Sequence, residues 1–283
     1  MKTKIAAVTA AIATALGLAV AAGPAQASTG GTPDGETHAG VAMILYYADG
    51  GRYRCSAALV SPTVLLTAAH CTDGTDGKTF VTFDSVVAEE PPSGLPAAAD
   101  PKAGFTEADL AGEIAGTAVT HPDYSGFQDL DSWNDVGVVV LDAPVSGLPV
   151  YGIAGLGTLD EIAPGDIPST IVTAVGYGTE VRKPASGPQK PTPMSYPLIR
   201  RYVDMPLQRV MPQVFQTIGN EHDTRGTGGT CFGDSGGPVF LGHEIVGVTS
   251  YGLTSNCRYI DGYQRVDIPT VQDWLADEGV PTP

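Results

Sequence analysis

The chain has 283 residues and a formal net charge of -16 at neutral pH, from 31 acidic and 15 basic residues. A surface this acidic argues against nucleic acid and anionic membranes as partners, because both carry the same sign of charge. The length suits one large or two small domains, and the absence of a C-x-x-C pair among the four cysteines argues against a zinc site.

The first segment predicts export. Lys2 and Lys4 precede an apolar, alanine-rich run from Ile5 to about Ala22, and Ala25-Gln26-Ala27 follows. This order is typical of a signal peptide that is cleaved after residue 27. A membrane anchor is the alternative, because the run is close to spanning length, but the A-x-A site and the absence of a basic stop favour removal. We therefore expect a secreted protein, in which four cysteines allow three disulfide pairings.

Short runs rich in Val, Ile, Thr and Tyr, separated by turn residues, predict strands in the first half. Asp49-Gly50-Gly51 predicts a turn, and residues 84–117 predict longer surface loops with some strand between them. The run Val136–Leu141 (VGVVVL) predicts a strand that is buried on both faces. The other predicted strands of this half are Val41–Tyr47, Cys55–Val60 and Thr63–Thr67.

The second half repeats this pattern and ends in a helix. Residues 143–168 read as a connection, and Arg182–Pro197 is too proline-rich for regular structure. Pro269–Asp277 (PTVQDWLAD) predicts a helix, with Pro at its start and Gly279 after it. The predicted strands are Ile171–Val175, Pro238–Leu241, Ile245–Ser250 and Tyr263–Val266.

Three short motifs carry the chemistry. They are Thr67-Ala68-Ala69-His70-Cys71, then Asn134-Asp135-Val136-Gly137, and Gly233-Asp234-Ser235-Gly236-Gly237-Pro238. A lone His after an apolar strand, an Asp opening a strand or a Gly-rich loop is usually structural when taken singly. Together, in the order His, Asp, Ser, they are the set that nucleophilic catalysis by a serine needs.

From about residue 30 to its end, the chain resembles the chymotrypsin/trypsin family of secreted serine peptidases. The resemblance implies an all-β fold of two six-stranded antiparallel Greek-key barrels with a C-terminal helix. Residues 28–150 would form the barrel carrying His70 and Asp135, and residues 151–283 the barrel carrying Ser235. It also implies hydrolysis of peptide bonds, with protein or peptide substrates and no cofactor or metal.

The proposed roles follow from the resemblance and have a physical reason. A serine hydroxyl must lose its proton as it attacks, and an imidazole can accept that proton. A buried carboxylate fixes the imidazole tautomer and stabilises the imidazolium. By resemblance Ser235 is the nucleophile, His70 the general base and Asp135 the group that orients it, while the backbone N–H groups of Gly233 and Ser235 form the oxyanion hole.

The family's disulfides would join Cys55 to Cys71 and Cys231 to Cys257. The matching substrate pocket comprises Gly229, Thr230, Ser250, Tyr251, Gly252 and Asp261. Trypsin has an Asp at the position of Gly229, so a simple trypsin-like specificity does not follow from the sequence. Asp261 could supply the missing carboxylate and select Arg or Lys. The alternative is an exposed turn residue in Asp261-Gly262, which would leave a pocket for apolar or aromatic side chains.

Activation in the family uses a new N-terminal amine that pairs with the Asp before the nucleophile, here Asp234. Signal cleavage would expose Ser28 at the matching position, so we expect that no separate propeptide is needed. We also expect a monomer, with protein inhibitors as a second class of partner. Two rivals are a non-catalytic binding protein on this fold and an esterase, although an esterase predicts G-x-S-x-G and the opposite chain order.

Overall fold

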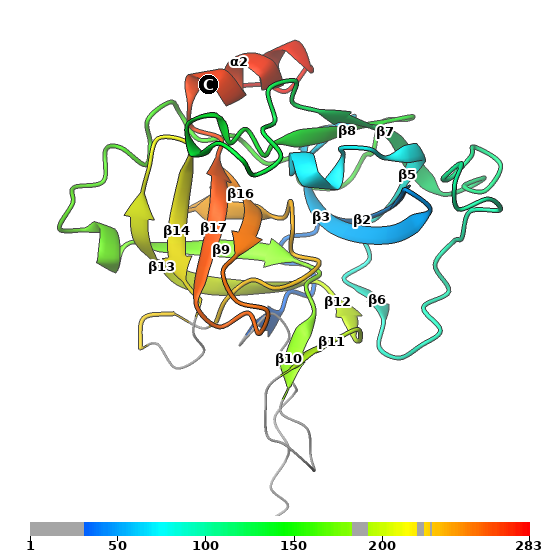
Figure 1. Ribbon diagram of the computed structural model, residues 1–283, viewed down its shortest axis with the longest axis horizontal. Coiled ribbons are helices and arrows are strands. Elements are labelled where there is room, and N and C mark those ends of the chain that lie inside the picture. The colour runs from blue at the N-terminus through cyan, green and yellow to red at the C-terminus, as the bar shows by residue number, and fades with distance from the viewer. Residues whose placement is uncertain (1–30, 183–191, 220–223, 227) are drawn as a thin grey trace, which may run out of the picture.

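The computed structural model describes residues 31–182, 192–219, 224–226 and 228–283. Strands dominate it, and two barrels lie side by side with the terminal helix across one end (Figure 1). The expected fold class is confirmed: each barrel is closed by six antiparallel strands. No helix among the described residues is long and apolar enough to cross a membrane.

The first barrel is closed in the order β2-β3-β4-β8-β7-β5. The β2–β3 hairpin turns at Asp49 and Gly50, whose φ angles of 50° and 73° suit the tight turn predicted there. Strand β8 is buried except for Val140, which is 36% exposed, so it is not covered on both faces throughout. The strands are β2 (Val41–Ala48), β3 (Gly51–Ser61), β4 (Val64–Thr67), β5 (Asp76–Thr82), β7 (Ile114–Thr120) and β8 (Gly137–Leu141).

The second barrel is closed by β9, β13, β14, β17, β16 and β15, and the short β1 pairs with the first two residues of β13. Strands β13 and β14 lie in a region where no strand was predicted. The strands are β1 (Thr32–Pro33), β9 (Ile171–Gly176), β13 (Arg201–Val210), β14 (Val214–Ile218), β15 (Pro238–Leu241), β16 (Glu244–Gly252) and β17 (Ile260–Arg265).

The remaining elements are short. The region expected to be an exposed loop, Arg182–Pro197, contains the short strand Thr192–Met194, which pairs with Glu180–Arg182, and its residues 183–191 lie outside the described part of the chain. These elements are β6 (Val86–Ala88), β10 (Glu180–Arg182), β11 (Thr192–Met194), β12 (Leu198–Ile199) and the 3-10 turns η1 (Ala69–Cys71), η2 (Leu130–Ser132) and η3 (Ile167–Ser169). The helix α2 covers Pro269–Asp277, as the sequence predicts.

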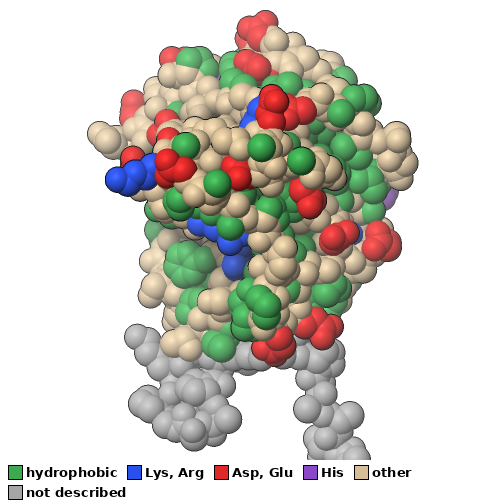
Figure 2. Space-filling view, turned by 90° about the vertical axis from the view of Figure 1, so that its right-hand side faces the viewer, with side chains coloured by type: hydrophobic (Ala, Val, Ile, Leu, Met, Phe, Trp, Pro, Cys, Tyr) green, Lys and Arg blue, Asp and Glu red, His purple; other side chains and the backbone are tan. Residues whose placement is uncertain are grey.

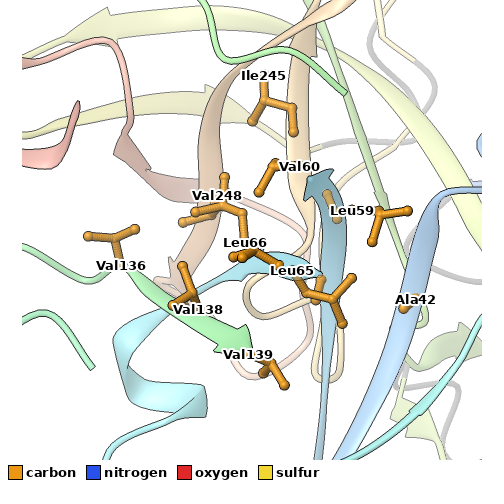
Figure 3. Close-up of a cluster of buried hydrophobic side chains, with 14 of the residues drawn as sticks. Ala42, Leu59, Val60, Leu65, Leu66, Val136, Val138, Val139, Ile245 and Val248 are labelled. Atoms are coloured by element: carbon orange, nitrogen blue, oxygen red, sulfur yellow. The ribbon is translucent and has the colours of Figure 1, made fainter. Parts of the chain in front are cut away.

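One hydrophobic core joins the two barrels. Ile245 and Val248 of β16 lie beside Val60 and Leu66 of the first barrel (Figure 3), and all four are at most 2% exposed. The same cluster includes Trp274 and Leu275 of α2. Because this core crosses the junction, the loops at that junction are held in fixed positions relative to each other. The three chemical motifs all lie there.

Candidate active site

His70 and Asp135 meet at the junction of the barrels. His70 lies in η1 directly after β4, and Asp135 lies just before β8, the neighbour of β4 in the sheet. The Nδ1 atom of His70 is 2.9 Å from Asp135 Oδ2, and the His70 backbone N–H donates to Oδ1 at 2.9 Å. The Asp135 side chain is fully buried, whereas that of His70 is 20% exposed. The imidazole is therefore held at one edge and open at the other.

The second barrel supplies further hydrogen bonds to Asp135. Ser250 on β16 donates its hydroxyl to Oδ2 at 2.6 Å, and Gln264 on β17 accepts from the Asp135 backbone N–H at 2.9 Å. The Trp133 indole donates to the Ser250 oxygen at 2.9 Å, which leaves the hydroxyl proton of Ser250 for the carboxylate. A buried carboxylate needs such donors, because it has lost its hydration.

His70 and Ser235 line one cavity of about 740 Å³. Its walls are mostly apolar or aromatic, and the ring centroid of Phe127 lies 5.4 Å from that of His70. Phe127, Trp133 and Gln264 belong to no motif, so the sequence analysis missed them; their proximity arises only when the barrels close. The cavity has the size and apolar character of a small-molecule or peptide-side-chain site.

The loop that carries Ser235 is fixed against β3. The Ser56 backbone N–H donates to the Ser235 carbonyl and its hydroxyl to the Gly233 carbonyl, both at 2.8 Å. Gly233 has φ = +100°, a conformation that L side chains rarely adopt. A methyl group there would also lie 2.8 Å from the Arg54 guanidinium. This explains why glycine is required before Asp234 and Ser235.

Two disulfides brace these segments. Cys55 of β3 is bonded to Cys71 of η1, across a sequence separation of 16, and Cys231 is bonded to Cys257 across 26. The first ties the segment bearing His70 to β3. The second ties the loop before Ser235 to the segment between β16 and β17, so it supports the cavity wall.

Asp261 lies inside the cavity and is not an exposed turn residue. It is 2% exposed within β17, and its Oδ2 accepts the Thr230 backbone N–H at 2.8 Å. A methyl group on Gly229 would lie 2.8 Å from this oxygen, and one on Gly219 would lie 2.5 Å from it. The glycines at these positions therefore make room for the carboxyl of Asp261.

Burial raises the pKa of Asp261 to about 7; the Thr230 hydrogen bond opposes this rise, and the charge of Asp234 adds to it. The other members of the expected pocket line the same cavity, except Gly229, which is not in the lining but lies against the carboxyl group of Asp261. They are Thr230, Ser250, Tyr251 and Gly252.

Asp234, the residue before Ser235, does not line this cavity. Its carboxylate accepts the backbone N–H of Gly178 at 2.7 Å and that of Cys231 at 2.9 Å. Ser28, its expected partner after activation, lies outside the described residues, as does the segment read as a signal peptide.

Comparison with known proteins places this geometry in a family. A model of the trypsin family, described as Trypsin, matches residues 29–275. The chain belongs to the trypsin family of serine endopeptidases. It is 26% identical over 241 residues to brachyurin from Leptuca pugilator, which covers 82% of this chain and 90% of that protein. It is also 26% identical over 206 residues to a trypsin from Saccharopolyspora erythraea, covering 71% and 77% of the two chains.

Solved structures agree on the trypsin-family fold. The structure named HL collagenase superposes with a TM-score of 0.60 and 17% identity, covering 91% of this chain and 99% of that one. Identity this low speaks for the fold alone. The expected family and the expected enzyme class are therefore confirmed by the family match.

Proposed function

We propose that this trypsin-family enzyme cleaves peptide bonds through an acyl-enzyme on Ser235. His70 would take the hydroxyl proton as the Ser235 oxygen attacks the carbonyl carbon. It would then give that proton to the amine nitrogen, the C–N bond would break, and the acyl group would stay on Ser235. A water molecule, deprotonated by His70, would release the acid and restore the serine. The buried contact between His70 Nδ1 and Asp135 is the observation that carries this proposal.

Asp135 would remain ionised throughout and hold the imidazole in the tautomer that leaves Nε2 free to accept a proton. Three donors contact its carboxylate, two from His70 and one from Ser250, and hold it in place against the imidazole. The backbone N–H groups of Gly233 and Ser235 would stabilise the oxyanion, each by about 3 kcal/mol. The hydrogen bonds from Ser56 to this loop support that geometry.

The cavity above Asp261 would receive the side chain that precedes the scissile bond. Its apolar walls suit a long aliphatic stem, and the carboxylate at its base suits the guanidinium of Arg or the ammonium of Lys. We therefore favour basic substrates when Asp261 is ionised. Apolar side chains would be accepted when it is neutral.

We further propose export, with residues 1–27 removed as a signal peptide and Ser28 left as the new N-terminus. Its amine would pair with Asp234, close to the loop that bears Ser235. The mature chain would comprise the halves 28–150 and 151–283 and act as a monomer on proteins and peptides. The many Asp and Glu side chains on the face in Figure 2 suit a soluble exported protein that avoids anionic partners.

Labelling with a serine-directed fluorophosphonate tests the proposed nucleophile. The folded wild-type protein should be modified at Ser235 and the urea-unfolded protein should not, because only the folded site activates the hydroxyl. Ser235→Ala should abolish labelling and lower peptide hydrolysis by about 10⁶-fold. Ser146→Ala, at an exposed serine, is the matched control and should change neither. A folded protein that is neither labelled nor active would instead support the non-catalytic binding function.

A further inference from the structure

A second hollow lies on the other side of Ser235 from Asp261. It measures about 410 Å³ and shares His70, Phe232 and Ser235 with the first cavity. Its other walls come from the β2–β3 hairpin, including Tyr46, Tyr53 and Arg54. A peptide bond positioned at Ser235 would place its acyl side over Asp261, so this second hollow would receive the segment that leaves.

Arg54 is the group in this hollow that most needs a partner. It lies on β3, is partly buried, and its Nε atom is buried without a hydrogen bond. Its guanidinium lies directly against Gly233, because a methyl group on that glycine would meet Nε at 2.8 Å and Nη2 at 3.3 Å. Within the described residues it makes no hydrogen bond or ion pair. Arg52, two positions earlier, is exposed and donates to the Pro96 carbonyl.

The charges around Arg54 leave it incompletely compensated. Burial lowers the pKa of Arg54, and the charges of Asp234 and Tyr196 oppose that change only in part. The carboxylate of Asp234 already accepts two backbone N–H groups. Asp49 and Asp73 also line the hollow, but both are exposed, so water and salt screen them more strongly than the half-buried guanidinium.

We propose that Arg54 is a specificity-determining residue that binds a carboxylate of the leaving segment, so that peptides with Glu or Asp just after the scissile bond are preferred substrates. This inference rests on the proposed peptidase function. A guanidinium can donate two parallel hydrogen bonds to a carboxylate, and a partly dry site strengthens them. The preference concerns the leaving segment only, and is independent of the side chain that Asp261 receives.

Internally quenched peptides test this proposal. They should share one sequence up to the scissile bond and carry Glu, Gln or Lys at the two positions after it. The wild-type enzyme should cleave the Glu peptide about tenfold faster in kcat/KM than the Gln peptide, and the Lys peptide more slowly still. The ratio of Glu to Gln should shrink as salt is raised, because the contact is ionic.

Variants of Arg54 test whether this residue causes the preference for Glu. Arg54→Gln should bring the Glu and Gln peptides to equal kcat/KM, and Arg54→Lys should restore part of the difference, since an ammonium binds without the bidentate geometry. Arg52→Gln is the matched control and should keep the wild-type ratio. Active-site titration corrects each rate for the amount of folded enzyme.

These experiments can refute the role of Arg54 and the peptidase function separately. An enzyme that cleaves the Glu and Gln peptides equally overturns the role of Arg54 and leaves the peptidase function intact. A preference that persists in Arg54→Gln overturns it as well. A protein that cleaves none of the peptides and is not labelled at Ser235 overturns the proposed function itself. The comparison of peptides on the wild-type enzyme stands even if a variant fails to fold.

Discussion

Asp261 is a single residue that adds an ionisable carboxyl group to the lining of the cavity. Groups near it are the phenol of Tyr263, whose pKa burial raises, and the carboxylate of Asp234; both lack a positive charge. Among the described residues no cation pairs with Asp261. The carboxyl is therefore neutral in acid and charged in alkali, with its midpoint near neutrality because its pKa is about 7.

The ratio of kcat/KM for a substrate with Arg before the scissile bond to that for one with Leu should rise with pH. Since Asp261 ionises near pH 7, the ratio should increase by up to about tenfold from about pH 6 to about pH 8. The proton transfers at His70 are common to both substrates and cancel in the ratio. In Asp261→Asn the ratio should be low and flat. A flat ratio in the wild-type enzyme would show that Asp261 does not contact the substrate.

The residues of the proposed triad could be predicted from the sequence, because each lies in a motif whose neighbours have a defined task. The position of Asp261 could not. A shift of one residue along a strand turns a side chain from one face of the sheet to the other, and the sequence does not fix that register. Arg54, Trp133 and Gln264 were missed for another reason: their partners are far along the chain, and no local pattern marks them.

At the scale of elements, one guanidinium joins the N-terminal segment to both barrels. Arg200, fully buried, donates to the carboxylate of Asp34 at 2.8 Å and to the carbonyls of Gly35, Val41 and Phe83. Burial alone would raise the pKa of Asp34, but hydrogen bonds from His38 and Arg200 outweigh it and hold the pKa below its ordinary value. The pair thus anchors the segment just after the proposed new N-terminus.

Replacing Arg200 by Leu should be strongly destabilising. It leaves Asp34 charged, buried and without its cation, which should lower the free energy of unfolding by about 3–5 kcal/mol in urea denaturation at neutral pH. Because the pKa of Asp34 is lowered in the fold, its contribution is present at neutral pH and is lost as the pH falls through that lowered value. Arg209→Leu, at an exposed site on β13, is the control and should change stability by less than about 0.5 kcal/mol. Equal effects of the two variants would refute the anchoring role.

Most strands with uniform apolar runs were predicted, and so was helix α2. Strand β13 was missed because its sequence, RYVDMPLQRV, mixes charged residues and a proline with apolar ones, and β14 was missed because VFQTI is a short run interrupted by a polar glutamine. In β13 the buried face includes a charged side chain, because Arg201 is only 3% exposed. Hydrophobic patterning cannot anticipate a strand whose buried face includes an arginine.

At the scale of the whole molecule, activation would depend on where the exported chain begins. We expect N-terminal sequencing of the active secreted protein to start at Ser28, since signal cleavage after Ala27 would expose it. Adding a Gly before Ser28 should lower activity by displacing the amine from Asp234, while far-UV circular dichroism stays unchanged. An active protein whose N-terminus lies well downstream of Ser28 would contradict direct activation by export.

Because both barrels fix the position of Asp135, the halves of two such enzymes cannot be combined freely. Asp135 belongs to the first barrel, yet the Ser250 hydroxyl that donates to its carboxylate and the Gln264 amide oxygen that accepts from its backbone N–H belong to the second. A hybrid that joins the first barrel of one enzyme to the second barrel of a relative would keep two intact barrels and still misplace Asp135, and with it the imidazole of His70. Compatible halves must therefore be matched at these two polar side chains as well as along the shared apolar seam.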